Sequence, residues 1–448
     1  MEENPLAPIA RRSRAAAWRL AAAATEDKDR TLAAVRDALV RRREEIARAN
    51  RADKEEAEAL VRAGKLSAAL GKRLDLEGPK FDAAIAQVDG VIRLPDPVGR
   101  VQYAMRLDGG LDLFRVTCPI GVLGVIFEAR PDAAIQISAL GLKSSNAVIL
   151  KGGREAERTN RAIVEAIREG LRASGKLPED AVELISTREE VRRLLELDEL
   201  VDLVIPRGSN ELVRSIQAST RIPVLGHADG LCAVYVDRAA DREKAIAVVL
   251  DAKTQYPAVC NAAETLLVHR AALETILPEL GDRLRDAGVE LRADRESRRV
   301  LPWAKPAQDA DYRTEFLDLV MAVKCVESLE EAVEHINVHG SHHTDAIVTE
   351  DRGAAEYFLS RVDSAGVFWN ASTRFADGYR YGLGAEVGIS TQKTHARGPV
   401  GLEGLVIYKY LLYGDGHCVG AYGPGRKSYL HAPLSGEEAA ARLRGGRA

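Results

Sequence analysis

The sequence predicts an α/β fold in which helices cover a mainly parallel sheet on both faces. Continuous apolar segments at 121–127, 147–150 and 201–205 have the composition of strands that are buried on both faces. Segments with apolar residues at helical spacing separate these strands, and this alternation is typical of a parallel sheet. The chain has 448 residues, too many for one hydrophobic core, so we expect two or three domains.

Composition limits the class of protein. Apolar residues make up 46% of the chain and charged residues 29%, which is typical of a soluble globular protein. The net charge of -4 gives no reason to expect a nucleic-acid or anionic-membrane partner, and no apolar run reaches the ~18 residues of a membrane helix. The 5 cysteines are scattered without a C-x-x-C pair, which argues against a disulfide framework or a zinc ribbon and suits a reducing compartment.

The N-terminal region is helical in pattern. Segment 11–24 is rich in Arg and Ala, which is compatible with an organellar transit peptide or with an exposed helix face. The early Glu2 and Glu3 and the direct continuation into a helical stretch favour the helix, so we expect a cytoplasmic protein. An apolar stripe opposite Arg and Glu continues through Leu32, Val35, Leu39 and Ile46, and a second helix is expected at about 54–63.

A β-hairpin is predicted at 101–118. Apolar residues alternate along both arms, and Gly109 and Gly110 offer the turn. The alternation changes phase between Leu113 and Phe114, where we expect a bulge.

The α/β region then follows in order. We expect helices at 133–143, 156–173, 188–197, 242–253, 271–287, 329–338 and up to 361, and strands at 121–127, 147–150, 182–185, 201–205, 265–268, 346–348, 367–370 and 404–410. The final segment, 419–448, is rich in Gly and Arg and is expected to be poorly ordered. Ligands of such sheets bind at the C-terminal ends of the strands.

Cys260 lies between the helix at 242–253 and the strand at 265–268. Pro257 disfavours helix at Tyr256, so a tight connection is expected to carry the thiol. Such a position can hold a reactive thiolate, although a lone cysteine more often has a buried structural role, and only the surrounding motifs favour the reactive thiol.

Two strand ends offer a cation followed by glycine. Lys151-Gly152-Gly153 and Arg207-Gly208-Ser209 suit a phosphate, or a ribose near one, at a helix start. Neither is the G-x-G-x-x-G fingerprint, and each alone is also explained by a turn that needs glycine. Both together, with Cys260 on a later connection, favour nucleotide and thiol chemistry.

Segment 370–378 follows another strand and combines amide, hydroxyl, guanidinium and carboxylate groups. Arg374 could bind a carboxylate and Asp377 an ammonium group, or the loop could be a turn held by its own side chains. His335 and His339 have i, i+4 spacing but lack the H-E-x-x-H pattern, so we interpret them as a helix surface and predict no metal.

Several longer motifs carry a resemblance to a known family. They are CPIGVLGVIFEARPD at 118–132, NAVILKGG at 146–153, IPRGS at 205–209, YPAVCNAAETLLVH at 256–269, HHTDAIVTE at 342–350, NASTRF at 370–375, GLGAEVGIST at 382–391 and HARGP at 395–399. Over about 12–412, the chain resembles the gamma-glutamyl phosphate reductases, or glutamate-5-semialdehyde dehydrogenases, of the aldehyde dehydrogenase superfamily.

The resemblance implies a domain organisation. Residues 1–100 and 119–253 would form a Rossmann-like NADP-binding domain, 254–396 a catalytic α/β domain, and 101–118 with 397–448 a small β oligomerisation element and tail. It further implies NADPH-dependent reduction of L-glutamyl 5-phosphate to L-glutamate 5-semialdehyde in proline biosynthesis. A homo-oligomer and a functional association with glutamate 5-kinase are also expected, with no nucleic-acid or membrane partner.

The same resemblance implies roles for individual residues. Cys260 would be the nucleophile, Lys151 would lie near the cofactor ribose or its phosphate, and Glu315 would lie near the nicotinamide ribose. Gly152, Gly208 and Ser209 would also contact cofactor, and Arg130, Asn261, Ser372 and Arg374 would contact substrate.

Two other functions stay open at this point. A hydrolytic aldehyde dehydrogenase would release its product without phosphate, and a non-catalytic nucleotide-binding scaffold would not need Cys260. Many hydrolytic members carry a glutamate base in the segment equivalent to 224–230. In this chain Gly226 stands at or near the position of that glutamate. The absence of a base there suits an enzyme that keeps its thioester from water.

Overall fold

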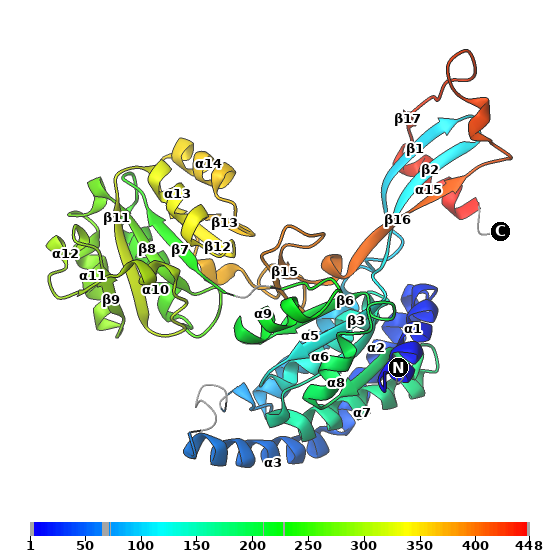
Figure 1. Cartoon of the computed structure of the whole chain (residues 1–448), viewed down its shortest axis with the longest axis horizontal. Helices are drawn as coiled ribbons and strands as arrows, with labels where there is room; N and C mark the ends of the chain where they lie inside the picture. Colours follow the sequence, from blue (N-terminus) through cyan, green and yellow to red (C-terminus); the bar gives the residue numbers. More distant parts are fainter. Residues whose placement is uncertain (1–3, 65–70, 72, 209, 227–228, 446–448) are drawn as a thin grey trace. The chain divides into compact units, whose positions relative to one another are not determined.

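The computed structural model describes residues 4–64, 71, 73–208, 210–226 and 229–445, and the chain divides into two compact units (Figure 1). Unit 1 comprises Met1–Val204, Thr220–Pro223 and Gly401–Ala448, and unit 2 comprises Ile205–Ser219 and Val224–Val400. Within the described ranges, no helix is both long enough and apolar enough to cross a membrane.

The sheet that begins in unit 1 has the order β5-β4-β3-β6. Its strands are β3 (Val122–Phe127), β4 (Ala147–Lys151), β5 (Val182–Ile185) and β6 (Leu203–Arg207), and β3, β4 and β5 pair in parallel. Every residue of β3 is buried, as its continuous apolar sequence predicts. The expected parallel pairing is therefore confirmed for β3, β4 and β5, whose bounds lie within one residue of the prediction, whereas β6 begins and ends two residues later than the predicted 201–205.

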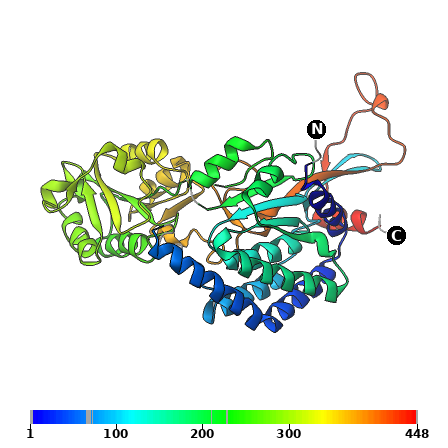
Figure 2. The ribbon, with the colours of Figure 1, turned by 60° about the horizontal axis from the view of Figure 1, so that its bottom comes forward.

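Helices pack against this sheet and against one another. They are α1 (Ala7–Ala21), α2 (Thr25–Arg41), α3 (Arg43–Arg62), α5 (Pro79–Arg93), α6 (Pro131–Lys143), α7 (Glu157–Ser174) and α8 (Arg188–Leu194). Helix α1 packs on β4, and α2 and α3 lie along α7 (Figure 2). Gly170 permits the close approach of α2 and α7, because a Cβ atom there would lie 2.7 Å from the backbone nitrogen of Val35.

The Arg- and Ala-rich N-terminal segment forms helix α1. Its small residues Ala10, Ala16 and Ala17 are buried on one face. In the same helix, Arg14 donates two hydrogen bonds to Asp202, at 2.7 and 3.0 Å. The segment is therefore an integral helix of unit 1, as its direct continuation into a helical stretch predicts.

A second, antiparallel sheet of unit 1 has the order β16-β2-β1-β17. It contains the predicted hairpin, β1 (Val101–Asp108) and β2 (Leu111–Pro119), flanked by β16 (Val406–Tyr413) and β17 (Ala432–Pro433). The predicted bulge is wrong, because Leu113 and Phe114 pair in continuous register with Met105 and Ala104. The phase does not slip because Asp112 lies on the buried face, where Arg106 donates to it at 2.9 Å.

The expectation of a poorly ordered tail is also wrong for the described residues. Helix α15 (Gly436–Gly445) buries Ala439 against Phe114 and Val116 of the hairpin. Nearer the turn, Asp108 accepts hydrogen bonds from Tyr422 and Lys427 at 2.8 and 2.7 Å. A few specific contacts thus order a segment whose composition alone predicts disorder.

Unit 2 is built on a wholly parallel sheet with the order β10-β9-β11-β8-β7-β12-β13. The strands are β7 (Cys232–Val236), β8 (Ala263–His269), β9 (Glu290–Ala293), β10 (Lys305–Pro306), β11 (Val320–Val326), β12 (Thr344–Val348) and β13 (Gly366–Trp369). Helices α10 (Arg242–Thr254) and α11 (Leu277–Asp286) cover one face, and α13 (Leu329–His339) and α14 (Arg352–Arg361) cover the other (Figure 1). Helix α9 (Asn210–Ser219) also belongs to this unit.

Strands β7, β9 and β11 were not predicted. Strand β7 and helix α10 belong to unit 2, as does Cys260. The expected domain boundary at 253/254 therefore lies inside unit 2 and does not coincide with the boundary between the two compact units. The predicted helix at 271–287 is shorter, because a 3-10 turn at Arg270–Ala272 precedes α11.

Candidate active site

Cys260 lies on the turn between α10 and β8, as predicted. The N–H of Ala262 donates to the carbonyl of Val259 at 3.0 Å and closes this turn. Cys260 is partly exposed, whereas Cys232 and Cys325 are buried. The arrangement therefore presents one partly exposed thiol on a short connection that leads into the N-terminal end of β8, a central strand of the parallel sheet.

A second thiol, that of Cys232, stabilises the turn by a hydrogen bond. Cys232, at the start of β7, donates to the carbonyl oxygen of Cys260 with a sulfur-to-oxygen distance of 3.3 Å. Burial raises the pKa of Cys232 well above its usual value, so this group stays a neutral thiol and a donor. His343 Nδ1 lies 3.7 Å from the same sulfur.

Asn261 joins the turn to the loop that follows β13. Its Nδ2 donates to the carbonyl of Ala376 at 2.8 Å, and the hydroxyl of Thr373 donates to the Asn261 carbonyl at 2.7 Å. Asn261 is buried, and its Oδ1 makes no hydrogen bond among the described residues. The predicted site residues Cys260, Asn261 and Ser372 are thus brought together by contacts between segments distant in sequence.

Arg374 is a buried cation beside this turn. Its Nε donates to Gln255 Oε1 at 2.9 Å, and its backbone N–H donates to Ser372 Oγ at 3.2 Å. Burial lowers the pKa of Arg374, while the negative charges of Asp377 and of a Cys260 thiolate oppose that effect. Gln255 was not singled out from the sequence, although it lies in the same connection as Cys260.

Glu315 and the end of β6 are linked through Asn210. The Nδ2 of Asn210 donates to Glu315 Oε2 at 3.0 Å and to Asp229 Oδ1 at 2.5 Å. Asn210 begins α9, directly after the predicted cofactor residues Gly208, which is exposed, and Ser209, which lies outside the described residues. Asn210 thus contacts the predicted cofactor residue Glu315, and sequence reasoning did not single it out.

Glu386 is a further residue that the sequence analysis missed. Its Oε2 accepts from the N–H of Gly378 at 2.8 Å, and its Oε1 lies 3.5 Å from Arg207 Nη2. Burial raises the pKa of Glu386, and the positive charge of Arg207 opposes this. Arg207 is therefore partnered by a carboxylate, which weakens the expectation that it binds phosphate.

The remaining predicted residues belong to unit 1. Lys151 ends β4 and is half-buried, and burial lowers its pKa, while the negative charges of Glu155 and Glu128 oppose that effect. Gly152 follows, where a Cβ atom would lie 2.8 Å from Asn160 Cγ. Arg130 precedes α6 and lies half-exposed, with Nη2 3.9 Å from Asp132 Oδ2. All three stand at the C-terminal ends of the neighbouring strands β3 and β4.

The interpretation as a helix surface is wrong for His335, whereas His339 is partly exposed. His335 is buried, stacks on His339 at 4.5 Å and meets the edge of Tyr312 at 5.4 Å. Burial lowers the pKa of His335 to about 4. The described residues contain no group of three or more His, Cys, Asp or Glu side chains arranged to hold a metal ion.

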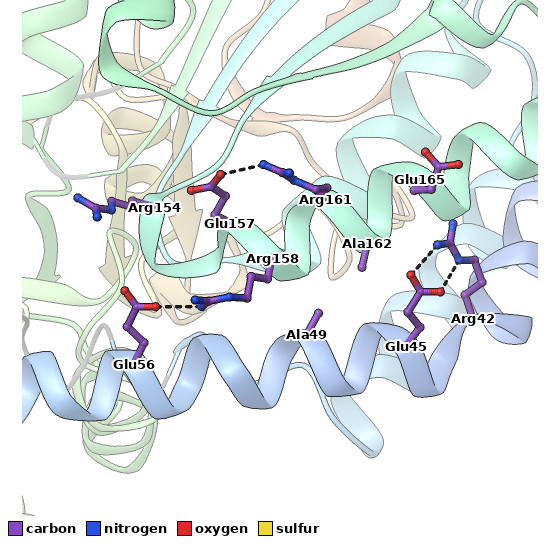
Figure 3. Close-up of a pocket in the computed structure, with 10 residues that line it drawn as sticks. All are labelled: Arg42, Glu45, Ala49, Glu56, Arg154, Glu157, Arg158, Arg161, Ala162 and Glu165. Atoms are coloured by element: carbon purple, nitrogen blue, oxygen red, sulfur yellow. Dashed lines mark hydrogen bonds and ion pairs between the residues drawn. The ribbon is translucent and has the colours of Figure 1, made fainter.

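A groove of about 700 Å³ runs between α3 and α7 in unit 1 (Figure 3). It is lined by Arg42, Glu45, Ala49, Glu56, Arg154, Glu157, Arg158, Arg161, Ala162 and Glu165. Arg42 pairs with Glu45 at 2.6 Å and Arg158 with Glu56 at 2.9 Å. Its charges are thus largely compensated within the groove, and we assign no substrate to it.

Comparison with known proteins identifies the family of this chain. The model of the aldehyde dehydrogenase family matches residues 2–314. A gamma-glutamyl phosphate reductase of Nostoc punctiforme is 52% identical over 432 residues, which cover 96% of this chain and 98% of that protein. A probable gamma-glutamyl phosphate reductase of Schizosaccharomyces pombe is 51% identical over 420 residues, covering 92% and 93%.

A solved structure extends the similarity to the fold. The crystal structure of gamma-glutamyl phosphate reductase from Thermotoga maritima matches with a TM-score of 0.88 and 41% sequence identity, covering 92% of this chain and 99% of that one. The family model, the relatives and the shared α/β fold show that this chain belongs to the gamma-glutamyl phosphate reductases of the aldehyde dehydrogenase family.

Proposed function

We propose that the protein reduces L-glutamyl 5-phosphate to L-glutamate 5-semialdehyde, in proline biosynthesis, through a thioester on Cys260. The relatives are named for this reduction. The observation that carries the proposal is the position of Cys260, partly exposed on a turn held by Asn261 and Cys232, with the buried Arg374 beside it.

The chemistry follows from an activated acyl group and a thiolate. The Cys260 sulfur attacks the acyl carbon, a carbon–sulfur bond forms, and the carbon–oxygen bond to phosphate breaks with release of inorganic phosphate. The oxyanion of this step needs donors, for which the backbone N–H of Cys260 and the amide of Asn261 are candidates. Hydride addition to the thioester gives a thiohemiacetal, which collapses to the aldehyde and the thiolate.

Substrate contacts are proposed for Arg374, Ser372, Asn261 and Arg130. Arg374 is a cation in a desolvated position, where a carboxylate of the glutamyl group would bind strongly. Ser372 and Asn261 hold the loop and the turn that carry this cation and the thiol. The half-exposed guanidinium of Arg130 is suited to an anionic part of the substrate.

NADPH is the proposed reductant, and bound NADPH would supply the hydride. Lys151 and Arg188 place positive charge at the ends of β4 and β5, as a ribose phosphate requires. Gly152 keeps the backbone beside Lys151 free of a side chain. Glu315 offers a carboxylate for ribose hydroxyls, and Gly208 and Ser209 complete the proposed cofactor contacts.

The wider organisation is proposed in the same way. The sheet that carries Lys151 would bind cofactor, and the sheet that carries Cys260 would be catalytic. The edge strand β16 exposes Ile407, Tyr408, Tyr410 and Leu412, so the sheet β16-β2-β1-β17 is suited to the association of copies of this chain. A cytoplasmic location and delivery of the acyl phosphate by glutamate 5-kinase complete the proposal.

The reverse reaction tests the proposal. Purified protein would receive glutamate semialdehyde and NADP, with reduced nicotinamide followed with and without added phosphate. Phosphate-dependent turnover is expected, and turnover that ignores phosphate would instead establish a hydrolytic dehydrogenase. Cys260→Ala should abolish turnover with the fold retained, whereas Cys418→Ala, at an exposed cysteine of the tail, should not.

A further inference from the structure

Lys253 and Glu264 form a fully buried ion pair at the base of the Cys260 turn. Lys253 Nζ, in the last turn of α10, lies 2.6 Å from Glu264 Oε2 in β8, and the two side chains are 0% and 1% exposed. The segment between them is the connection that carries Cys260. The pair therefore ties together the two ends of the connection that holds the nucleophile.

The other oxygen of Glu264 reaches a third segment. Glu264 Oε1 accepts a hydrogen bond from the backbone N–H of Leu317 at 3.2 Å. Leu317 has a φ of 53°, in the left-handed region that a leucine avoids, and its side chain is 42% exposed. Burial of the side chain therefore does little to favour this conformation, whereas the hydrogen bond to a buried carboxylate does.

The turn at Leu317 closely follows the proposed cofactor residue Glu315. Asn210 fixes the Glu315 carboxylate at 3.0 Å, and Arg292 lies over the Phe316 ring, 5.0 Å from its centre. Glu264 holds the next residue along the chain. One carboxylate thus contacts both the base of the nucleophile turn and the segment of Glu315.

Stability alone does not explain a buried ion pair in this place. Removing two charges from water is costly, and apolar replacements of such pairs are often as stable. Burial raises the pKa of Glu264 to about 7 and lowers that of Lys253, which shows the cost of keeping both groups charged. The two contacts of the Glu264 carboxylate, with Lys253 and with the N–H of Leu317, account for the pair better than stability does.

We propose that Glu264, held by Lys253, is a positioning residue that fixes the Glu315 segment relative to the Cys260 turn. The bound cofactor is then aligned with the thioester. This inference rests on the proposed function. It predicts that loss of the Leu317 conformation weakens NADPH binding while the thiol stays reactive.

The first test uses a matched pair of substitutions at an exposed position. Leu317→Pro removes the N–H donor and forbids a positive φ, whereas Leu317→Gly keeps the donor and adopts that φ without strain. The dissociation constant for NADPH would be measured by nicotinamide fluorescence, and the Cys260 thiol by its rate of iodoacetamide labelling. We expect a rise of about tenfold in the constant for Leu317→Pro only, with labelling rates of both variants within about twofold of the unsubstituted protein.

A second comparison changes the carboxylate itself. Lys253→Met/Glu264→Gln keeps an acceptor for Leu317 in a neutral pair, and Lys253→Met/Glu264→Leu removes it at similar volume. We expect the second double variant, with an unchanged circular dichroism spectrum, to bind NADPH about tenfold more weakly than the first.

Equal NADPH affinity of Leu317→Pro and Leu317→Gly would overturn the inference, even if the double variants fail to fold. Failure of the proposed function is a separate result, since the unsubstituted protein would then bind no NADPH or show no phosphate-dependent turnover.

Discussion

Gly230 lies directly against the backbone of Cys260. A Cβ atom at Gly230 would overlap the Cys260 main chain and lie 2.6 Å from its Cβ. Gly230 precedes β7, and the N–H of the next residue, Leu231, donates to Ser341 Oγ at 2.8 Å. This hydrogen bond restrains the segment of Gly230 from moving away from Cys260. The position of the proposed nucleophile therefore depends on the absence of a side chain at residue 230.

Gly230→Ala should therefore displace Cys260 without preventing folding. A misplacement of about 1 Å in a reacting group can lower a rate by about 100-fold, and we expect a loss of that order in phosphate-dependent turnover. The measurement is the reverse reaction together with the rate of iodoacetamide labelling. Gly436→Ala is the matched control, because a Cβ atom there meets open space. Activity of Gly230→Ala equal to that of the control would show that the thiol tolerates the shift.

The Cys260 turn could be predicted because its signals are local. Pro257 restricts the residue before it, and an apolar strand follows directly, so sequence neighbours define the connection. The strand ends at Lys151 and Arg207 were found in the same way. These features depend on propensities that act within a few residues.

The rest of the site depends on contacts between distant segments, which leave no local pattern. Asn261 and Ala376 are separated by 115 positions, and the sequence does not show that their hydrogen bond exists. Strand β9 is a short alternation of apolar and charged residues, and Lys324 interrupts the apolar run of β11, so neither resembles a buried strand. Likewise, His335 packs against Tyr312 of another segment, a contact that the pattern of its own helix does not show.

Lys151→Met should weaken the binding of NADPH more than that of NADH. A hydrogen bond to a charged group contributes about 1.5–3 kcal/mol, so KM for NADPH should rise about 10- to 100-fold. The comparison of KM for the two cofactors separates a phosphate contact from general damage. Lys176→Met is the control, since that side chain is half-exposed and pairs with Asp27 at 3.6 Å. An unchanged ratio of the KM values for NADPH and NADH would show that Lys151 does not contact the ribose phosphate.

Arg374→Gln should raise KM for glutamate semialdehyde by about 10- to 100-fold, because a buried cation would no longer meet the substrate carboxylate. Binding of NADPH should be unaffected, and this split is the useful readout. Arg352→Gln, at an exposed arginine that pairs with Glu356 at 2.7 Å, controls for loss of a positive charge. A variant with normal KM but poor folding would assign Arg374 to the packing of its loop on Gln255 instead.

His335 should make the protein less stable in mild acid. Burial lowers its pKa to about 4 in the folded protein, against about 6.5 in an unfolded chain, so the unfolded state binds more protons between these values. Stability is therefore lost as the pH falls through this range, and the two pKa values imply a loss of about 2 kcal/mol between pH 7.5 and pH 5.

His335→Phe tests this directly, because a phenyl ring keeps the contact with Tyr312 and cannot take up a proton. Thermal unfolding at pH 7.5 and pH 5 should show a smaller fall in Tm for this variant than for the unsubstituted protein. His431→Asn is the control, since His431 is exposed, has a φ of 46° and lies outside this cluster, and asparagine tolerates that conformation. If His335→Phe and the control lose the same Tm on acidification, then protonation of His335 does not contribute to the acid sensitivity.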